Sequence, residues 1–218
     1  MSWISPVIDA RSKLINSNPD NHGQKKEAPL KKVKNILLYR IIIEIGGKMK
    51  LEAFIRDVPD FPEKGIIFKD ITTLLKDEKA FKHAADLMVE KYRDKHIDKI
   101  VGIESRGFIF GGIVAYKLGC GFIPARKPGK LPAETISEDY TLEYGKNTLE
   151  LHVDSIEEGE NVVIIDDLLA TGGTALAVAK LVEKLKGNIL GIEFLIELKF
   201  LNGIEKLQGY PVTSCIQY

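Results

Sequence analysis

The clearest chemical signal in the sequence is a pair of adjacent acids, Asp166 and Asp167, between a hydrophobic run and a glycine-containing turn. The run, residues 161–165, is short, apolar and β-branched, which predicts a buried strand. The turn consists of Ala170, Thr171, Gly172, Gly173 and Thr174. Glycines let a backbone approach phosphate closely, and the start of a following helix offers free N–H groups. We therefore predict a phosphate monoester on this turn.

The two carboxylates would repel a phosphate placed directly on them, so they indicate a sugar beside it. Carboxylates accept hydrogen bonds from vicinal hydroxyl groups, as the acid of a dinucleotide-binding fold does for ribose. Phosphate on the turn and ribose over Asp166 and Asp167 make a ribose-5-phosphate site. The simpler alternative is a helix N-cap with two capping or solvated acids. A Walker-type P-loop is excluded because no Gly-Lys-Ser/Thr follows.

The elements that must position these residues alternate from Met49 onward. Apolar spacing predicts helices over 79–93, 107–118 and 174–186, and strands over 99–103, 121–125, 161–165 and 190–198. This alternation predicts an α/β fold with a mostly parallel central sheet flanked by helices. Ligands of such sheets bind at the carboxyl ends of the strands, where residues 166–174 would lie.

Composition and charge exclude several classes of protein. The 218 residues are 44% hydrophobic with a formal net charge of zero, so a large core is possible and nothing global attracts nucleic acid or membrane. Two cysteines make no disulfide framework and favour a reduced, cytoplasmic location. The longest apolar run, residues 36–43, is broken by Arg40 and is too short to span a membrane. We expect neither a nucleic-acid nor a membrane partner.

Residues 1–48 differ from the rest of the chain. They contain nine Lys or Arg and four Asp or Glu, so they are basic while the remainder is acidic. Residues 16–34 have a polar, Lys-rich composition typical of disorder, and residues 36–45 would suit a short strand or helix. We expect a disordered or partly ordered extension over 1–48 and one domain over 49–218, with Met49 a candidate native start. A basic arm for RNA or membrane is the alternative.

Four further segments accompany the turn in order: residues 60–72, 102–111, 126–132 with 140–145, and 196–207. With these segments the chain resembles the adenine phosphoribosyltransferase family of the type I phosphoribosyltransferases. The resemblance implies the type I fold, with a small hood over 60–72 and a mobile flap over 128–147. It also implies the reaction of adenine with 5-phosphoribosyl-1-pyrophosphate (PRPP) to give AMP and pyrophosphate in purine salvage.

The resemblance assigns the hood to the base. Phe68 would stack on the purine, and the backbone of Ile67 and Lys69 would face its Watson–Crick edge, with Leu168 as a further adenine contact. Backbone groups matched to adenine would reject a 6-oxo purine because mismatched partners remain unsatisfied. For Phe68 the alternative is an ordinary core aromatic.

By the same resemblance, residues Glu104-Ser105-Arg106 form the pyrophosphate loop, in which the peptide before the serine is often cis. Arg106 would also be catalytic, since its planar donors can pair bidentately with the oxygens of the leaving group. Further assigned pyrophosphate contacts are Arg126, Lys127 and Lys130. The family also suggests a homodimer, with Arg126 and Lys127 reaching across its interface.

The flap would close over PRPP and exclude water. Glu143 would take the purine proton as N9 attacks C1′, and Tyr144 would pack or gate the flap. Mg²⁺ would be bound mainly through PRPP or pyrophosphate, without ligands from protein side chains, because this ion retains several waters. A solvated loop acid is the alternative for Glu143.

Two other functions use the same PRPP signature. A xanthine or hypoxanthine-guanine enzyme would differ in the hood and in residues 140–145, so both segments favour adenine. A PRPP-sensing regulator that binds nucleic acid would carry a DNA-reading domain, and residues 1–48 are too short and irregular for a helix-turn-helix module.

Overall fold

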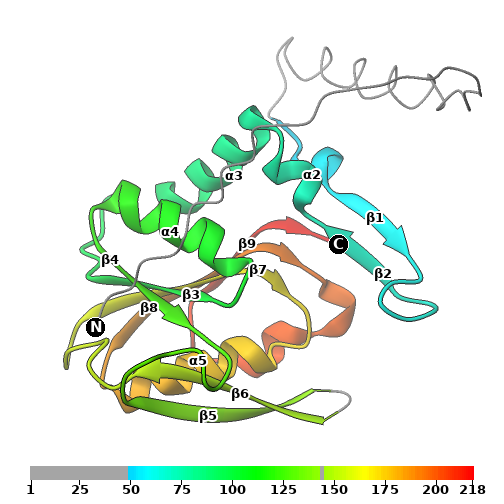
Figure 1. Cartoon of the computed structure of the whole chain (residues 1–218). Helices are drawn as coiled ribbons and strands as arrows, with labels where there is room; N and C mark the ends of the chain where they lie inside the picture. The colour runs from blue at the N-terminus through cyan, green and yellow to red at the C-terminus, as the bar shows by residue number, and fades with distance from the viewer. Residues whose placement is uncertain (1–48, 143–144) are drawn as a thin grey trace, which may run out of the picture. The chain divides into compact units, whose positions relative to one another are not determined.

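The computed structural model describes residues 49–142 and 145–218, and their centre is a five-stranded parallel sheet (Figure 1). The strand order is β4–β3–β7–β8–β9, and every neighbouring pair is parallel. The strands are β3 (Lys99–Ile103), β4 (Gly121–Ala125), β7 (Asn161–Leu169), β8 (Asn188–Glu197) and β9 (Val212–Gln217). The predicted mostly parallel central sheet is confirmed.

Helices cover both faces of this sheet. Helices α3 (Glu78–Glu90) and α4 (Gly107–Leu118) lie on one face, and α5 (Gly173–Lys184) lies on the other (Figure 1). Alternate residues of β7 enter the two layers: Val163 and Ile165 pack with α3 and α4, while Val162 and Ile164 pack with α5. The apolar run of β7 is continuous because both of its faces are buried.

The predicted helices and strands are found with small shifts at their ends, except that the predicted end of the strand at Ile165 is wrong. Strand β7 continues to Leu169, with Asp166 opposite Phe194 and Leu168 opposite Ile196 of β8. The backbone can continue because β8 offers ladder partners along this whole length. The acids therefore lie within the strand rather than after it. The strand or helix predicted over 36–45 lies outside the described residues.

Two antiparallel ribbons lie outside the central sheet. Strands β1 (Arg56–Pro59) and β2 (Ile67–Asp70) form the β1–β2 ribbon, which contains most of the predicted hood. It is preceded by a 3-10 turn, Leu51–Phe54, and followed by the short helix α2 (Thr72–Leu75). Strands β5 (Thr135–Leu142) and β6 (Gly145–His152) form the β5–β6 hairpin in the region of the predicted flap.

The chain returns to the sheet through two 3-10 turns, Lys199–Leu201 and Gly203–Leu207, before β9. Among the helices of the described residues, none has the length and apolar character needed to cross a membrane.

Candidate active site

The two acids of β7 contact the start of α4. Asp167 is almost fully buried, and the Arg106 Nε atom lies 2.7 Å from its Oδ2 atom. The Asp167 N–H donates to Asp166 Oδ1 over 2.8 Å. A Cβ on Gly107 would lie 2.9 Å from the same Asp166 oxygen, so only glycine lets α4 begin this close to the acids. The structure thus brings the predicted ribose acids and the predicted pyrophosphate arginine together.

Burial raises the pKa of the Asp166 carboxyl well above its ordinary value, and the charge of Asp167 raises it further. Burial also raises the pKa of Asp167, although the Arg106 guanidinium opposes that rise. Ionising both groups is therefore unfavourable in this environment. Hydroxyl donors or a cation beside the pair would reduce that cost.

The turn after β7 is shaped by two glycines from distant parts of the sequence. Gly172 has φ +77°, and a Cβ there would lie 2.3 Å from the carbonyl oxygen of Gly203. A Cβ on Gly203 would in turn lie 2.1 Å from the carbonyl oxygen of Ala170. Residues 170–174 are therefore backed by the segment around Gly203 and lead directly into α5. Sequence reasoning did not identify Gly203, because a lone glycine after Asn202 indicates only a turn.

The residues assigned to pyrophosphate gather around Glu104. Lys130 forms an ion pair with its Oε1 atom, the Lys127 N–H donates to Oε2 over 3.0 Å, and the Arg126 Nε atom lies 3.4 Å from Oε2. Burial alone would raise the pKa of Glu104, but Lys130, Lys127 and Arg126 outweigh it and lower the pKa. The peptide between Glu104 and Ser105 is cis, as the resemblance implied. Glu104 therefore holds the charged groups of Arg126 and Lys130 close together, two residues before Arg106 in the chain.

The β1–β2 ribbon presents Phe68 to the same arginine. The Arg106 Cζ atom lies 5.2 Å from the centre of the Phe68 ring, and Phe61 contacts that ring edge-on with the centroids 5.3 Å apart. A cavity of about 250 Å³ is lined by Val58, Phe61, Phe68 and Asp70. Phe68 is half-buried and borders this cavity, a position compatible with stacking on a flat ligand.

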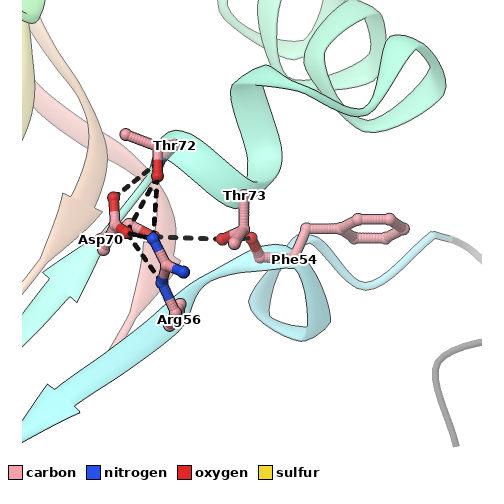
Figure 2. A network of polar contacts seen from close by, with 5 residues as sticks. All are labelled: Phe54, Arg56, Asp70, Thr72 and Thr73. Carbon is pink, nitrogen blue, oxygen red and sulfur yellow. Dashed lines mark hydrogen bonds and ion pairs between the residues drawn. The ribbon is translucent and has the colours of Figure 1, made fainter. Parts of the chain in front are cut away.

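A polar network at the base of the ribbon fixes the end of β2 (Figure 2). The Arg56 Nε atom donates to Asp70 Oδ2 over 2.9 Å, and the Thr72 N–H donates to Asp70 Oδ1 over 2.8 Å. The Thr73 hydroxyl donates to the carbonyl oxygen of Phe54 over 2.6 Å. Burial works against the charged form of Asp70, but the donors on Thr72 and Arg56 lower its pKa overall. The network joins β1, β2 and α2 where Asp70 borders the cavity.

The remaining predicted base contacts are more scattered. Ile67 is exposed, Leu168 packs partly against the α3–α4 core, and the Lys69 Nζ atom lies 2.8 Å from Asp57 Oδ1.

Glu143 and Tyr144, assigned to the flap, lie outside the described residues. Within residues 49–142 and 145–218, no group of three or more His, Cys, Asp or Glu side chains could hold a metal ion.

The described part of the flap region is tied to α5. Lys184 Nζ lies 2.7 Å from one carboxylate oxygen of Glu138 on β5, and Lys180 Nζ lies 3.1 Å from the other. Ile136 and Tyr140 pack against the core beneath α5. The helix that begins at the phosphate turn therefore also holds the β5–β6 hairpin.

Comparison with known proteins agrees with this architecture. Residues 70–206 match the family model of the phosphoribosyl transferase domain, so fold and site define a phosphoribosyltransferase. The chain is 58% identical over 170 residues to the adenine phosphoribosyltransferase of Brachyspira hyodysenteriae, covering 78% of this chain and 100% of that protein. The corresponding enzyme of Thermosipho africanus is 60% identical over 168 residues, which cover 77% of this chain and 99% of the relative. The chain belongs to the adenine phosphoribosyltransferase family.

Solved structures lead to the same family. The adenine phosphoribosyltransferase from Thermoanaerobacter pseudethanolicus matches with a TM-score of 0.75 and 54% identity, over 77% of this chain and 98% of that one. These matches confirm the predicted type I fold and the prediction of a glycosyl-transferring enzyme.

Proposed function

We propose that this protein transfers the 5-phosphoribosyl group of PRPP to adenine, giving AMP and pyrophosphate in purine salvage in the cytoplasm. The position of Arg106 carries the proposal, because its guanidinium group joins an aromatic ring to a buried acid. It lies 5.2 Å from the Phe68 ring and 2.7 Å from Asp167. A base stacked on Phe68, a pyrophosphate bound by Arg106 and a ribose bound by Asp167 would thus lie next to one another.

The names of solved relatives support these ligands. The relative from Saccharomyces cerevisiae, 38% identical, was crystallised with adenine and an imino-altritol bisphosphate, and that from Trypanosoma brucei, 25% identical, with AMP, pyrophosphate and ribose-5-phosphate. By analogy, residues 170–174 would bind the 5′-phosphate with backbone N–H groups. Asp166 and Asp167 would accept hydrogen bonds from the ribose hydroxyls, which would offset the cost of burying two carboxylates.

In the proposed reaction the bond between C1′ and the pyrophosphate oxygen breaks as the bond between N9 and C1′ forms. The departing pyrophosphate would be stabilised by four basic residues: Arg106, Arg126, Lys127 and Lys130. Ser105 would contribute the backbone of the loop. Glu104 would hold the cations of this loop close together. Phe68 would stack on adenine, with the backbone of Ile67 and Lys69 at its Watson–Crick edge and Leu168 packed beside it.

We further propose Mg²⁺ as the cofactor, bound mainly through oxygens of PRPP or pyrophosphate. A hard cation that keeps several waters suits such a site, because substrate oxygens and water can fill its coordination sphere without ligands from protein side chains. When bound, the ion would neutralise charge on the pyrophosphate.

The flap residues complete the proposed mechanism. Glu143 would accept the proton from N9 of adenine, and Tyr144 would pack over the substrates when the flap closes. Exclusion of water by the closed flap would protect the electron-poor C1′ from hydrolysis.

We also propose a homodimer, in which α4 faces a second copy of the chain. Helix α4 is apolar around most of its circumference, and its Tyr116 side chain is 86% exposed. A helix that is apolar all round is normally buried. Sedimentation of the purified chain should give twice the monomer mass, and a monomer at micromolar concentration would contradict this arrangement.

An assay of nucleotide formation tests the main proposal. PRPP and Mg²⁺ are supplied with adenine, hypoxanthine, guanine or xanthine in parallel reactions. The full chain is compared with a version that starts at Met49. We expect AMP from adenine alone, at equal rates in both versions. Turnover of a 6-oxo purine instead would contradict the assigned role of the hood, and PRPP binding without turnover of any base would favour a sensor.

A further inference from the structure

Lys69 does not point toward the cavity beside Phe68. In the β1–β2 ribbon, Val58 pairs with Phe68 while Asp57 pairs with Lys69, and successive residues of a strand face opposite sides. Val58 and Phe68 line the cavity, so the side chains of Asp57 and Lys69 occupy the other face. That face of the ribbon has no role in the reaction as described above.

The Lys69 side chain is held against the last strand of the sheet. It is only 12% exposed, and its Nζ atom lies 3.7 Å from the centre of the Tyr218 ring. Asp57 Oδ1 lies 2.8 Å from the same ammonium group. A lysine ammonium over an aromatic face is attracted by the π electrons, most strongly where water is excluded. The contact joins residues that are 149 positions apart in the sequence.

Tyr218 is itself fixed to the carboxyl edge of the central sheet. Its N–H donates to the carbonyl oxygen of Glu197 at the end of β8 over 3.0 Å, and its carbonyl oxygen accepts from the Lys199 N–H over 2.9 Å. The side chain also packs against the α3–α4 core. In Figure 1 the C-terminal end of the chain lies beside β2. The ring is therefore a fixed point on the sheet that carries the ribose acids.

We propose that Tyr218 is a positioning residue that holds the β1–β2 ribbon through Lys69 and so sets where Phe68 stands relative to Arg106 and Asp167. A ribbon of two four-residue strands is marginally stable without external support. Its polar network to α2 fixes one end of β2, and the contact between Lys69 and Tyr218 ties the back of the ribbon to the sheet. The inference rests on the proposed binding of the base beside Phe68.

Loss of this contact should weaken adenine binding selectively. A ribbon that is free to move would have to be ordered when adenine binds, which lowers the apparent affinity for the base. PRPP would be affected little, because its proposed contacts lie on β7, on the turn into α5 and on the loops after β3 and β4.

The test compares Tyr218→Leu, which removes the aromatic face, with Tyr218→Phe, which retains it. We expect Tyr218→Leu to raise KM for adenine about tenfold, as for loss of a partly desolvated cation–π contact. KM for PRPP should change less than about twofold, and Tyr218→Phe should match the unmodified chain. In a Lys69→Met background, Tyr218→Leu should have no further effect, because its role acts through Lys69.

Equal rises in both KM values, or fully additive effects of Lys69→Met and Tyr218→Leu, would overturn the proposal. Hydrogen exchange of the amides of residues 56–70 gives a second readout that needs no activity: exchange should be faster in Tyr218→Leu than in Tyr218→Phe, and equal rates would also overturn it. If the unmodified chain did not use adenine, the proposed function would fail while the exchange measurement still tested the contact. If Tyr218→Leu did not fold, Lys69→Met against the unmodified chain would supply both readouts.

Discussion

The carboxyl end of β7 and the β1–β2 ribbon hold the two halves of the proposed substrate pair in different ways. Residues 166–169 continue strand β7, which pairs with β3 as far as Ile165 and with β8 as far as Leu169, and the turn that follows is backed closely by Gly203. The ribbon pairs only with itself and leaves Phe61, Ile66 and Ile67 exposed. Outside its own strands it contacts Arg106, Tyr218 and α2.

From this difference we expect the two regions to bind different substrates. In the proposed reaction, phosphate and ribose would be bound at the carboxyl end of β7 by backbone N–H groups and buried acids. The base would be bound by the β1–β2 ribbon, whose contacts with the sheet come from residues distant in the sequence. Substitutions in the first region should impair the use of PRPP, and substitutions in the second should impair the use of adenine.

Proton transfer is assigned to Glu143, which belongs to neither of the two substrate-binding regions. The variant Glu143→Gln tests this assignment. We expect kcat to fall at least about a hundredfold, because general acid–base catalysis contributes roughly 10²–10⁴-fold. The dissociation constant for adenine, measured by calorimetry, should change little. An unchanged kcat would remove Glu143 from the chemistry.

Asp167→Asn should have the next largest effect and should act on PRPP. Loss of the charged acceptor for a ribose hydroxyl should lower kcat/KM for PRPP about ten- to a hundredfold, since hydrogen bonds to charged groups are worth roughly 1.5–3 kcal/mol. Initial rates at varied PRPP, with KM for adenine as the internal control, measure the effect. PRPP kinetics close to those of the unmodified chain would contradict the assigned ribose role.

Phe68→Leu should affect the other substrate. Losing a stacked ring should raise KM for adenine about tenfold, because base–aromatic stacking is worth roughly 1–3 kcal/mol. Phe200→Leu is the matched control, since Phe200 is 70% exposed on the turn after β8 and belongs to neither region. If Phe68→Leu changed the two KM values equally, the separation of the regions would be lost.

Asp166→Asn should produce the smallest effect, a gain in stability at the expense of function. The folded protein raises the pKa of Asp166, so it binds a proton more tightly than the unfolded chain, and this carboxyl destabilises the fold as pH rises above its ordinary titration range. The amide variant should therefore melt a few degrees higher at pH 7, for a gain on the order of 1 kcal/mol. The gain should disappear below about pH 4, where the carboxyl is protonated in both states.

Thermal melts of both proteins from about pH 3 to about pH 8, without substrates, provide the measurement. A variant that is less stable than the unmodified chain at pH 7 would mean that the carboxylate is stabilised by its surroundings. Asp77→Asn is a useful comparison, because Asp77 caps α3 outside the site and its side chain accepts from the Ala80 N–H.

Much of the sheet could be predicted because the residue types in short stretches of the chain indicate buried strands. Residues 100–103 and 162–165 are apolar and mostly β-branched, and a strand buried on both faces suits such a run. The end of β7 could not be predicted in this way. Asp166 and Asp167 are poor strand formers by composition, and the ladder continues through them because β8 lies alongside and supplies hydrogen-bond partners.

The sequence alone thus determined the α/β class, the parallel sheet, the two acids followed by a glycine-containing turn, and the resemblance to the family. These features are local, because the spacing of hydrophobic residues, the positions of glycines and the motifs can each be recognised within short stretches of the sequence. Tertiary structure decided which groups meet: Arg106 with Phe68 and Asp167, Gly172 against Gly203, and Lys69 against Tyr218. No local pattern encodes such pairs, since each depends on how separate elements pack around the same sheet.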